Sequence, residues 1–169
     1  MSISFEPVTT EEDQEFLAKL ADGIWHEYWP ALIGSAQTDY MIEKFQSLEA
    51  IKRDMSENAY EYWILRDEEG QVLGFTGGHD EPETQRFFIS KIYLLAEQRG
   101  KGYARQTIEF YNQLCLDRGL RAMYLTVNKG NELGIRAYKG TGFTTIDAVE
   151  TDIGEGFIMD DYIMEREAK

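Results

Sequence analysis

The sequence predicts an α/β fold of the α+β kind, with a mostly antiparallel mixed sheet. Three observations support this prediction. Stretches with helical amphipathic spacing alternate with short stretches rich in β-branched and aromatic residues. Two pairs of strand-like stretches, within 59–78 and 143–167, are separated by turn-like residues and predict hairpins. One strand–helix–strand segment, residues 85–127, predicts a parallel pair at the centre of the sheet.

The length and composition predict one domain. The chain has 169 residues, of which 43% are hydrophobic and 13% aromatic, which is enough for a real core. No linker, internal repeat or low-complexity tract interrupts it. We therefore expect a single domain over residues 1–169, with about seven strands and about four helices.

The N-terminal half is predicted to contain the first helices and a hairpin. Residues 3–8 have the pattern of an edge strand, and the capping-box pattern in 9–13 predicts the start of a helix. One face of that helix carries Phe16, Leu17, Leu20, Ile24 and Trp25. The further elements expected here are helices over 34–47 and 48–57, and strands over 59–67 and 71–78 with Gly70 at the turn.

The C-terminal half is predicted to contain the parallel pair and a final hairpin. A long strand over 85–95 is followed by a helix over 101–119, which Gly119 ends. The further elements expected here are a strand over 121–127, a short helix over 131–143, and strands over 143–150 and 157–167 with 151–156 between them.

Charge and cysteine content exclude several classes of function. The formal net charge of -14 argues against nucleic acid as the main partner, because phosphate backbones need a basic surface. It is compatible with a cationic substrate. No stretch is apolar enough to span a membrane, and the acidic N-terminus is no signal peptide. Cys115, the only cysteine, is expected to be a small buried hydrophobe, and we expect a cytoplasmic protein.

A basic, glycine-containing turn stands out in this acidic chain. Arg99, Lys101 and Arg105 surround two glycines between the strand over 85–95 and the following helix. Such turns often bind phosphate, because a helix N-terminus offers unpaired N–H groups and partial positive charge. The spacing matches neither a P-loop nor a dinucleotide fingerprint, in which Arg105 would have to be glycine.

A third phosphate-binding pattern does match. Arg99, Gly102 and Ala104 fit [RQ]-x-x-G-x-[GA], which resembles the acetyl-CoA loop of the GNAT N-acetyltransferase superfamily. About thirty residues later, "NELGIRAYKGTGF" matches a second signature of that superfamily, through Asn131, Gly134, Tyr138, Gly142 and Phe143. The order of predicted elements also agrees with that fold.

The resemblance implies an acetyl-CoA site and no metal. In that fold the central strand separates from its parallel neighbour at its C-terminal end, and pantetheine lies in the gap. The N–H of Ile92 is then expected to polarise the thioester carbonyl, as in an oxyanion hole. The expected cofactor-binding residues are Ile92, Tyr93, Leu94, Arg99, Gly100, Lys101, Gly102, Tyr103, Ala104, Arg105, Asn131 and Tyr138.

The same resemblance assigns roles on the helix over 131–143. Asn131 and Tyr138 are seven residues apart and share one helical face. Asn131 is expected to contact the cofactor, and Gly134 to allow the cofactor or a strand to come close. Tyr138 is expected to protonate the leaving thiolate as a general acid, with a core aromatic as the alternative.

The general base is not identified by the resemblance. Some members of the superfamily carry a glutamate on the central strand, at the positions that Phe88 and Ser90 occupy here. An ordered water or a residue from elsewhere must then take the proton. His79 is the best candidate in the sequence, and His26 is a weaker one.

The acceptor is predicted to be an amine. Aromatic residues in 24–47 and the acidic residues Asp152, Glu155, Asp160 and Asp161 suit a cationic substrate, although both sets could be purely structural. The layout is loosely similar to bacterial spermidine/spermine-type acetyltransferases. We therefore expect a small amine such as a polyamine. A peptide or protein amine, a non-catalytic CoA-binding sensor module, and a homodimer all stay open.

Overall fold

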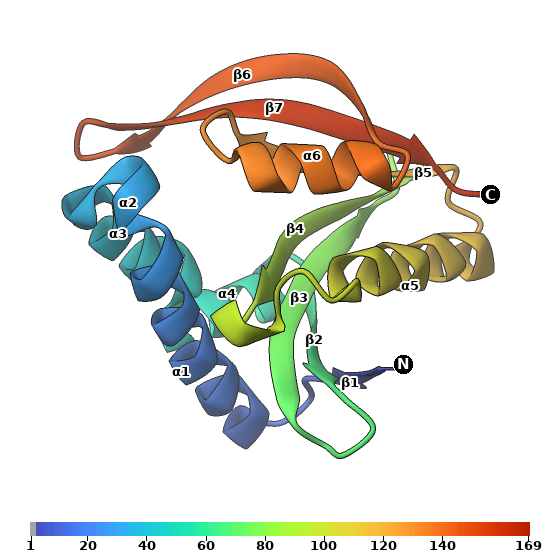
Figure 1. Ribbon diagram of the computed structural model, residues 1–169, viewed down its shortest axis with the longest axis horizontal. Coiled ribbons are helices and arrows are strands. Elements are labelled where there is room, and N and C mark those ends of the chain that lie inside the picture. Colours follow the sequence, from blue (N-terminus) through green and yellow to red (C-terminus); the bar gives the residue numbers. More distant parts are fainter. Residues whose placement is uncertain (1–2) are drawn as a thin grey trace. The chain divides into compact units, whose positions relative to one another are not determined.

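The computed structural model describes residues 3–169 and contains a seven-stranded sheet in the order β1-β2-β3-β4-β5-β7-β6 (Figure 1). The strands are β1 (Ser4–Pro7), β2 (Glu61–Arg66), β3 (Val72–Glu81), β4 (Arg86–Leu94), β5 (Ala122–Asn128), β6 (Thr144–Gly154) and β7 (Phe157–Glu167). The α-helices are α1 (Glu11–Tyr28), α2 (Pro30–Ile33), α3 (Ser35–Met41), α4 (Leu48–Glu57), α5 (Tyr103–Arg118) and α6 (Glu132–Gly140). A π-helix, η1 (Ile42–Gln46), and a 3₁₀ turn, η2 (Ala96–Gln98), complete the elements.

Strand pairing confirms the predicted fold class. β1 with β2, β2 with β3, β5 with β7 and β6 with β7 are antiparallel pairs. β4 and β5 are parallel, as the strand–helix–strand pattern predicted. The protein is therefore an α/β protein with a mostly antiparallel sheet.

The described chain divides into two compact units that share β4. The first contains the residues up to His79 together with Lys91–Tyr103, and the second contains Asp80–Ser90 together with Ala104–Lys169. The predicted organisation as one domain stays a prediction.

In the first unit, helices α1 and α4 pack on β2 and β3. A buried apolar cluster joins the two helices to the two strands, and its members are Val8, Leu17, Ala21, Ile24, Ile51, Tyr62, Ile64 and Phe75. A second cluster joins Leu65 and Leu73 to Tyr103, the first residue of α5. Because Tyr103 is buried there, the turn before α5 is anchored to β2 and β3.

In the second unit, α5 packs on the beginning of the parallel pair. The ring of Phe87 on β4 lies 5.0 Å from that of Tyr111 on α5. Cys115 is fully buried and its Sγ lies 3.8 Å from the carbonyl oxygen of Ala122. Burial raises the pKa of its thiol to about 11, and the prediction of a small buried cysteine is confirmed.

The elements differ from the predicted ones in several places. The short helix α2 was not predicted, and β3 continues to Glu81, beyond the predicted end at residue 78. The segment expected as a helix over 34–47 is α3 followed by the π-helix η1. From Ile42 on, the backbone hydrogen bonds join residues five apart instead of four. Residues 151–154, expected as a connection, continue β6 instead. The turn to β7 consists of Glu155 and Gly156 alone, and both have positive φ angles, as a two-residue hairpin turn requires.

Candidate active site

The end of β4 presents the backbone that was predicted to bind the donor. The side chain of Tyr93 turns into the core of the first unit, where its ring lies 5.4 Å from Phe75 and 5.5 Å from Trp25. These ring contacts fix the position of Tyr93, and its neighbours on the strand are Ile92 and Leu94. The role predicted for these three residues depends on their backbone, so the partly buried side chain of Tyr93 is compatible with it.

The turn after η2 is open around its glycines. Gly100 and Gly102 have φ angles of 77° and 87°, a region that favours glycine. A Cβ atom on either residue would meet no other atom within 4 Å. The backbone of the turn is therefore accessible to a ligand, and α5, whose N-terminus carries partial positive charge, starts directly after it.

The side chain of Arg99 fastens this turn to α1. Its guanidinium lies 3.0 Å from the Glu27 carboxylate, donates to the carbonyl oxygen of Leu94 at 3.0 Å, and lies 4.9 Å from the centre of the Tyr28 ring. Lys101, by contrast, is exposed, and its Nζ donates only a long 3.3 Å bond to Gln98. Lys101 therefore makes fewer contacts with the protein than Arg99 does.

The first turn of α5 is tied to the end of α6 in the second unit. Arg105 donates to the carbonyl oxygen of Gly140, the last residue of α6, at 3.2 Å. A cation at a helix C-terminus is stabilising, because the last carbonyls carry partial negative charge. Arg105 therefore links the two helices that carry the predicted donor-binding and acid residues.

Asn131 caps α6. Its side-chain oxygen accepts from the backbone N–H of Gly134 at 3.0 Å. A Cβ on Gly134 would lie only 2.6 Å from Asn131 Nδ2, so a larger residue here would push the capping side chain of Asn131 aside. The expectation that Gly134 also lets a cofactor or strand come close stays a prediction. The motif spacing from Asn131 to Gly134 is the spacing of a helix cap.

The backbone of Tyr138 is held by the residues after it. Its carbonyl oxygen accepts from the backbone N–H of Thr141 at 3.0 Å, from that of Phe143 at 3.1 Å and from the Thr141 hydroxyl at 2.8 Å. The half-buried Tyr138 ring packs edge-on against buried Phe143 at 5.8 Å. These contacts fix the backbone and the ring of Tyr138, and its proton-transfer role stays a prediction.

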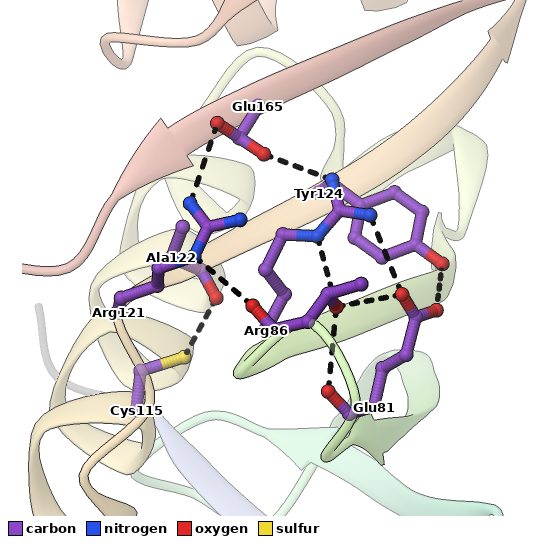
Figure 2. Close-up of polar contacts among 8 residues, drawn as sticks. Glu81, Arg86, Cys115, Arg121, Ala122, Tyr124 and Glu165 are labelled. Carbon is purple, nitrogen blue, oxygen red and sulfur yellow. Dashed lines mark hydrogen bonds and ion pairs between the residues drawn. The ribbon is translucent and has the colours of Figure 1, made fainter.

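The parallel pair is fixed at its beginning. The paired positions of β4 and β5 are Arg86↔Ala122, Phe87↔Met123 and Phe88↔Tyr124. Figure 2 shows Arg86 between Glu81 and Glu165, with its guanidinium 2.9 Å from Glu165 and 3.3 Å from Glu81. The same guanidinium lies 4.0 Å from the centre of the Tyr124 ring. This cluster holds the strands together where they start, and the ladder ends at Phe88.

The two histidines differ in their surroundings. His79 lies at the end of β3 in the first unit, with its ring 5.1 Å from that of Tyr60. His26 is exposed on α1, 2.9 Å from the Asp39 carboxylate, and this hydrogen bond raises the pKa of His26. His26 therefore already has a carboxylate partner on the protein surface, and it stays the weaker of the two candidates for the base.

Lys91 is a buried cation that the sequence reasoning missed. It lies on β4 next to Ile92, and its Nζ donates to the Phe45 carbonyl and the Tyr62 hydroxyl, both at 2.8 Å. Burial lowers the pKa of Lys91 to about 7. The lone charge inside the apolar run "FFISKIYLL" was the available signal. Lys91 connects β4 to η1 beside the predicted oxyanion donor.

The predicted site residues fall into two groups. His79, Ile92, Tyr93, Leu94 and the residues from Arg99 to Tyr103 lie in the first unit, and Ala104, Arg105, Asn131 and Tyr138 lie in the second. Within residues 3–169, no three His, Cys, Asp or Glu side chains gather as a metal site. In the same part of the chain, the helices are all too short or too polar to cross a membrane.

Comparison with known proteins adds an independent line of evidence. The model of the acetyltransferase (GNAT) family matches residues 21–143. The uncharacterized N-acetyltransferase YycN of Bacillus subtilis (strain 168) is 28% identical over 151 residues, which cover 88% of this chain and 97% of that protein.

Two solved structures are similar in fold. One is the PaiA N-acetyltransferase of Thermoplasma acidophilum in complex with coenzyme A, with a TM-score of 0.78, 21% identity and 99% coverage of both chains. The other is the spermidine N-acetyltransferase of Vibrio cholerae in complex with CoA and spermine. It has a TM-score of 0.69 and 18% identity, and covers 98% of this chain and 95% of that one.

Proposed function

Because the chain belongs to the acetyltransferase (GNAT) family, we propose that it transfers the acetyl group of acetyl-CoA to a primary amine of a small molecule. The observation that carries this proposal is the segment from β4 to α5. A strand end, a turn with two glycines at positive φ, and a helix N-terminus follow one another over Ile92–Ala104. In this order, the strand end can bind the thioester of acetyl-CoA, and the turn and helix N-terminus can bind its pyrophosphate.

The open space around the two glycines supports acetyl-CoA as the ligand of this turn. The space where a Cβ would stand on Gly100 and Gly102 is open, so phosphate oxygens can approach the backbone N–H groups. Lys101 adds a nearby positive charge. The buried ring of Tyr103 keeps the helix start fixed, so little ordering is needed when the donor binds.

The proposed reaction is direct attack of the amine on the thioester carbonyl. The N–H of Ile92 stabilises the negative charge that develops on the carbonyl oxygen. As the carbon–nitrogen bond forms and the carbon–sulfur bond breaks, Tyr138 gives its proton to the leaving thiolate. His79 or an ordered water removes the proton from the attacking nitrogen. Holding both substrates together supplies much of the rate.

A polyamine is the acceptor that we favour. The net charge of -14 attracts cations, and one of the structural relatives binds spermine according to its description. A peptide amine is the other acceptor class to test. A homodimer and a cytoplasmic location also stay predictions.

The test is thiol release from acetyl-CoA in the presence of an amine panel. Spermidine, spermine, a monoamine and a peptide with a free N-terminus are each added, and the acetylated product is identified by mass spectrometry. Release that depends on an added amine supports the proposal. Tight CoA binding without amine-dependent release would indicate the non-catalytic CoA-binding module instead.

A further inference from the structure

Asp161 is a largely buried residue with a charged side chain. It lies on β7 and is only 5% exposed. Among residues 3–169, no hydrogen bond or ion pair reaches its side chain. The other buried acid, Asp54, accepts a 3.0 Å hydrogen bond from Asn58, and the half-buried Glu165 pairs with Arg86. Because burying an unpaired charge is costly, Asp161 needs a separate explanation.

The register of the strands places Asp161 on a particular face of the sheet. Asp161 lies opposite Asn128, the last residue of β5, and Tyr124 lies four residues earlier on the same side of that strand. Tyr124 in turn pairs with Phe88 of β4, and their rings stack at 4.9 Å. Asp161 is therefore on the face that carries Phe88, about 13 Å further along β5 at the usual strand rise.

Charged groups around Asp161 do not neutralise it. The adjacent Asp160 points to the opposite face of the sheet and pairs with Lys129 at 2.8 Å. Lys129 directly follows the last residue of β5. On β6, Val149 lies opposite Asp161, the adjacent Glu150 lies opposite Asp160, and Asp147, the nearest acid on the same face as Val149, is exposed. Burial, and next the charge of Asp160, raise the pKa of Asp161 to about 6 against a smaller lowering by the charge of Lys129, so Asp161 is ionised at neutral pH.

We propose that Asp161 binds a second cationic group of the acceptor, one that is not acetylated, and thereby selects diamines and longer polyamines. The inference rests on the proposed acetyltransferase function. An ammonium that is paired with a buried carboxylate is held in its charged form, and its nitrogen has no lone pair for attack. The group that attacks the thioester must therefore be a different amine of the same molecule. A monoamine would leave the carboxylate unpaired.

The experiment compares two substrates in three proteins. The diamine is 1,4-diaminobutane, and the monoamine is n-pentylamine, which has the same number of non-hydrogen atoms. The proteins are the wild type, Asp161→Asn, and the control Asp160→Asn, which removes the neighbouring, half-buried carboxylate that pairs with Lys129. Asp161→Asn has nearly the same shape and removes an unpaired charge, so its melting temperature should not fall.

We expect Asp161→Asn to lower kcat/KM for the diamine by roughly 30-fold or more, the usual loss when one partner of a buried charge pair is removed. Its kcat/KM for the monoamine and its KM for acetyl-CoA should stay close to the wild-type values. Asp160→Asn should resemble the wild type with both substrates. In the wild type, the preference for the diamine should disappear as the pH falls through about 6.

An unchanged ratio of diamine to monoamine turnover in Asp161→Asn would overturn the inference. If the wild type acetylates no amine at all, the proposed function fails, and the inference is then decided by binding alone. Titration of 1,4-diaminobutane into the CoA-loaded proteins, followed by NMR, should show binding to the wild type that Asp161→Asn loses. Equal binding to both proteins would contradict it.

Discussion

Gly74 on β3 lies directly against the backbone of β4, and this approach makes a strong prediction. A Cβ atom at position 74 would lie 2.1 Å from the carbonyl oxygen of Tyr93 and 2.9 Å from the Cα of Leu94. Real Cβ atoms essentially never come closer than 3.0 Å to such atoms. Gly74→Ala must therefore move the two strands apart by at least 0.9 Å, the difference between 3.0 and 2.1 Å. Both neighbours are backbone atoms, so no side chain can rotate away.

The size of the effect follows from that displacement. Overpacking of this kind costs about 1–3 kcal/mol, and we expect the upper end, roughly 3 kcal/mol, because backbone must move. For a chain of this length that corresponds to a melting temperature about 6–12 °C lower. A shift of about 1 Å in a group that positions the substrate can cost roughly 100-fold in rate. The shifted segment is adjacent to Ile92, so kcat/KM for acetyl-CoA should fall by about that factor.

Two measurements check this prediction, with a matched control. Calorimetry gives the melting temperature, and thiol release gives kcat/KM for acetyl-CoA. The control is Gly23→Ala in α1, where a Cβ would meet nothing within 4 Å. It should stabilise the protein by about 0.5–1 kcal/mol, because alanine favours a helix over glycine. If Gly74→Ala keeps both the wild-type melting temperature and the wild-type kcat/KM, the reasoning about this strand contact is refuted.

Three further predictions concern the donor site and β4. Gly102→Glu should weaken CoA binding about 100-fold or more by calorimetry, because it brings a negative charge to the proposed pyrophosphate site. The side chain meets no other atom within 4 Å, but the φ of 87° strains the exposed turn, so Gly102→Ala, which carries the strain without the charge, is the control. Wild-type affinity of Gly102→Glu, or an equal loss in Gly102→Ala, would contradict the role of charge in the loop assignment. Tyr138→Phe should lower kcat by about 100-fold with little change in KM for acetyl-CoA, and an unchanged kcat would remove Tyr138 from the acid role. The pKa of Lys91 is lowered from 10.5 to about 7 in the folded protein, so the unfolded chain binds this proton more readily. The free energy of unfolding should therefore rise between about pH 7 and 10.5, by up to roughly 5 kcal/mol. Lys91→Met should flatten that rise in urea unfolding; an equally steep rise in the variant would argue against the lowered pKa.

The fold was largely predictable because its signals are local. Alternating patterns and turn residues predicted all seven strands, and the strand–helix–strand pattern predicted the parallel pair between β4 and β5. The extent of β6 was missed, since residues 151–154 carry polar side chains that are as common in a loop as in an exposed strand. The π-helix η1 was also missed, because it differs from an α-helix only in its backbone bonding.

The site was predictable in its backbone part and less so in its side chains. The positive φ angles at Gly100 and Gly102 agree with the motif. The partners of Arg99 on α1 and of Arg105 on α6 could not be foreseen, because both are far away in the sequence. In the sequence, nothing distinguishes Asp161 from the neighbouring Asp160. The difference between them comes from the strand register and from the burial of Asp161, which only the structure shows.

The most direct test of the central claim is amine-dependent release of CoA from acetyl-CoA. The account predicts that the wild-type protein releases thiol faster with spermidine or 1,4-diaminobutane than without amine. It also predicts that mass spectrometry finds the amine heavier by one acetyl group. If CoA binds tightly but no amine in the panel is acetylated, the account of this protein as an amine acetyltransferase is contradicted.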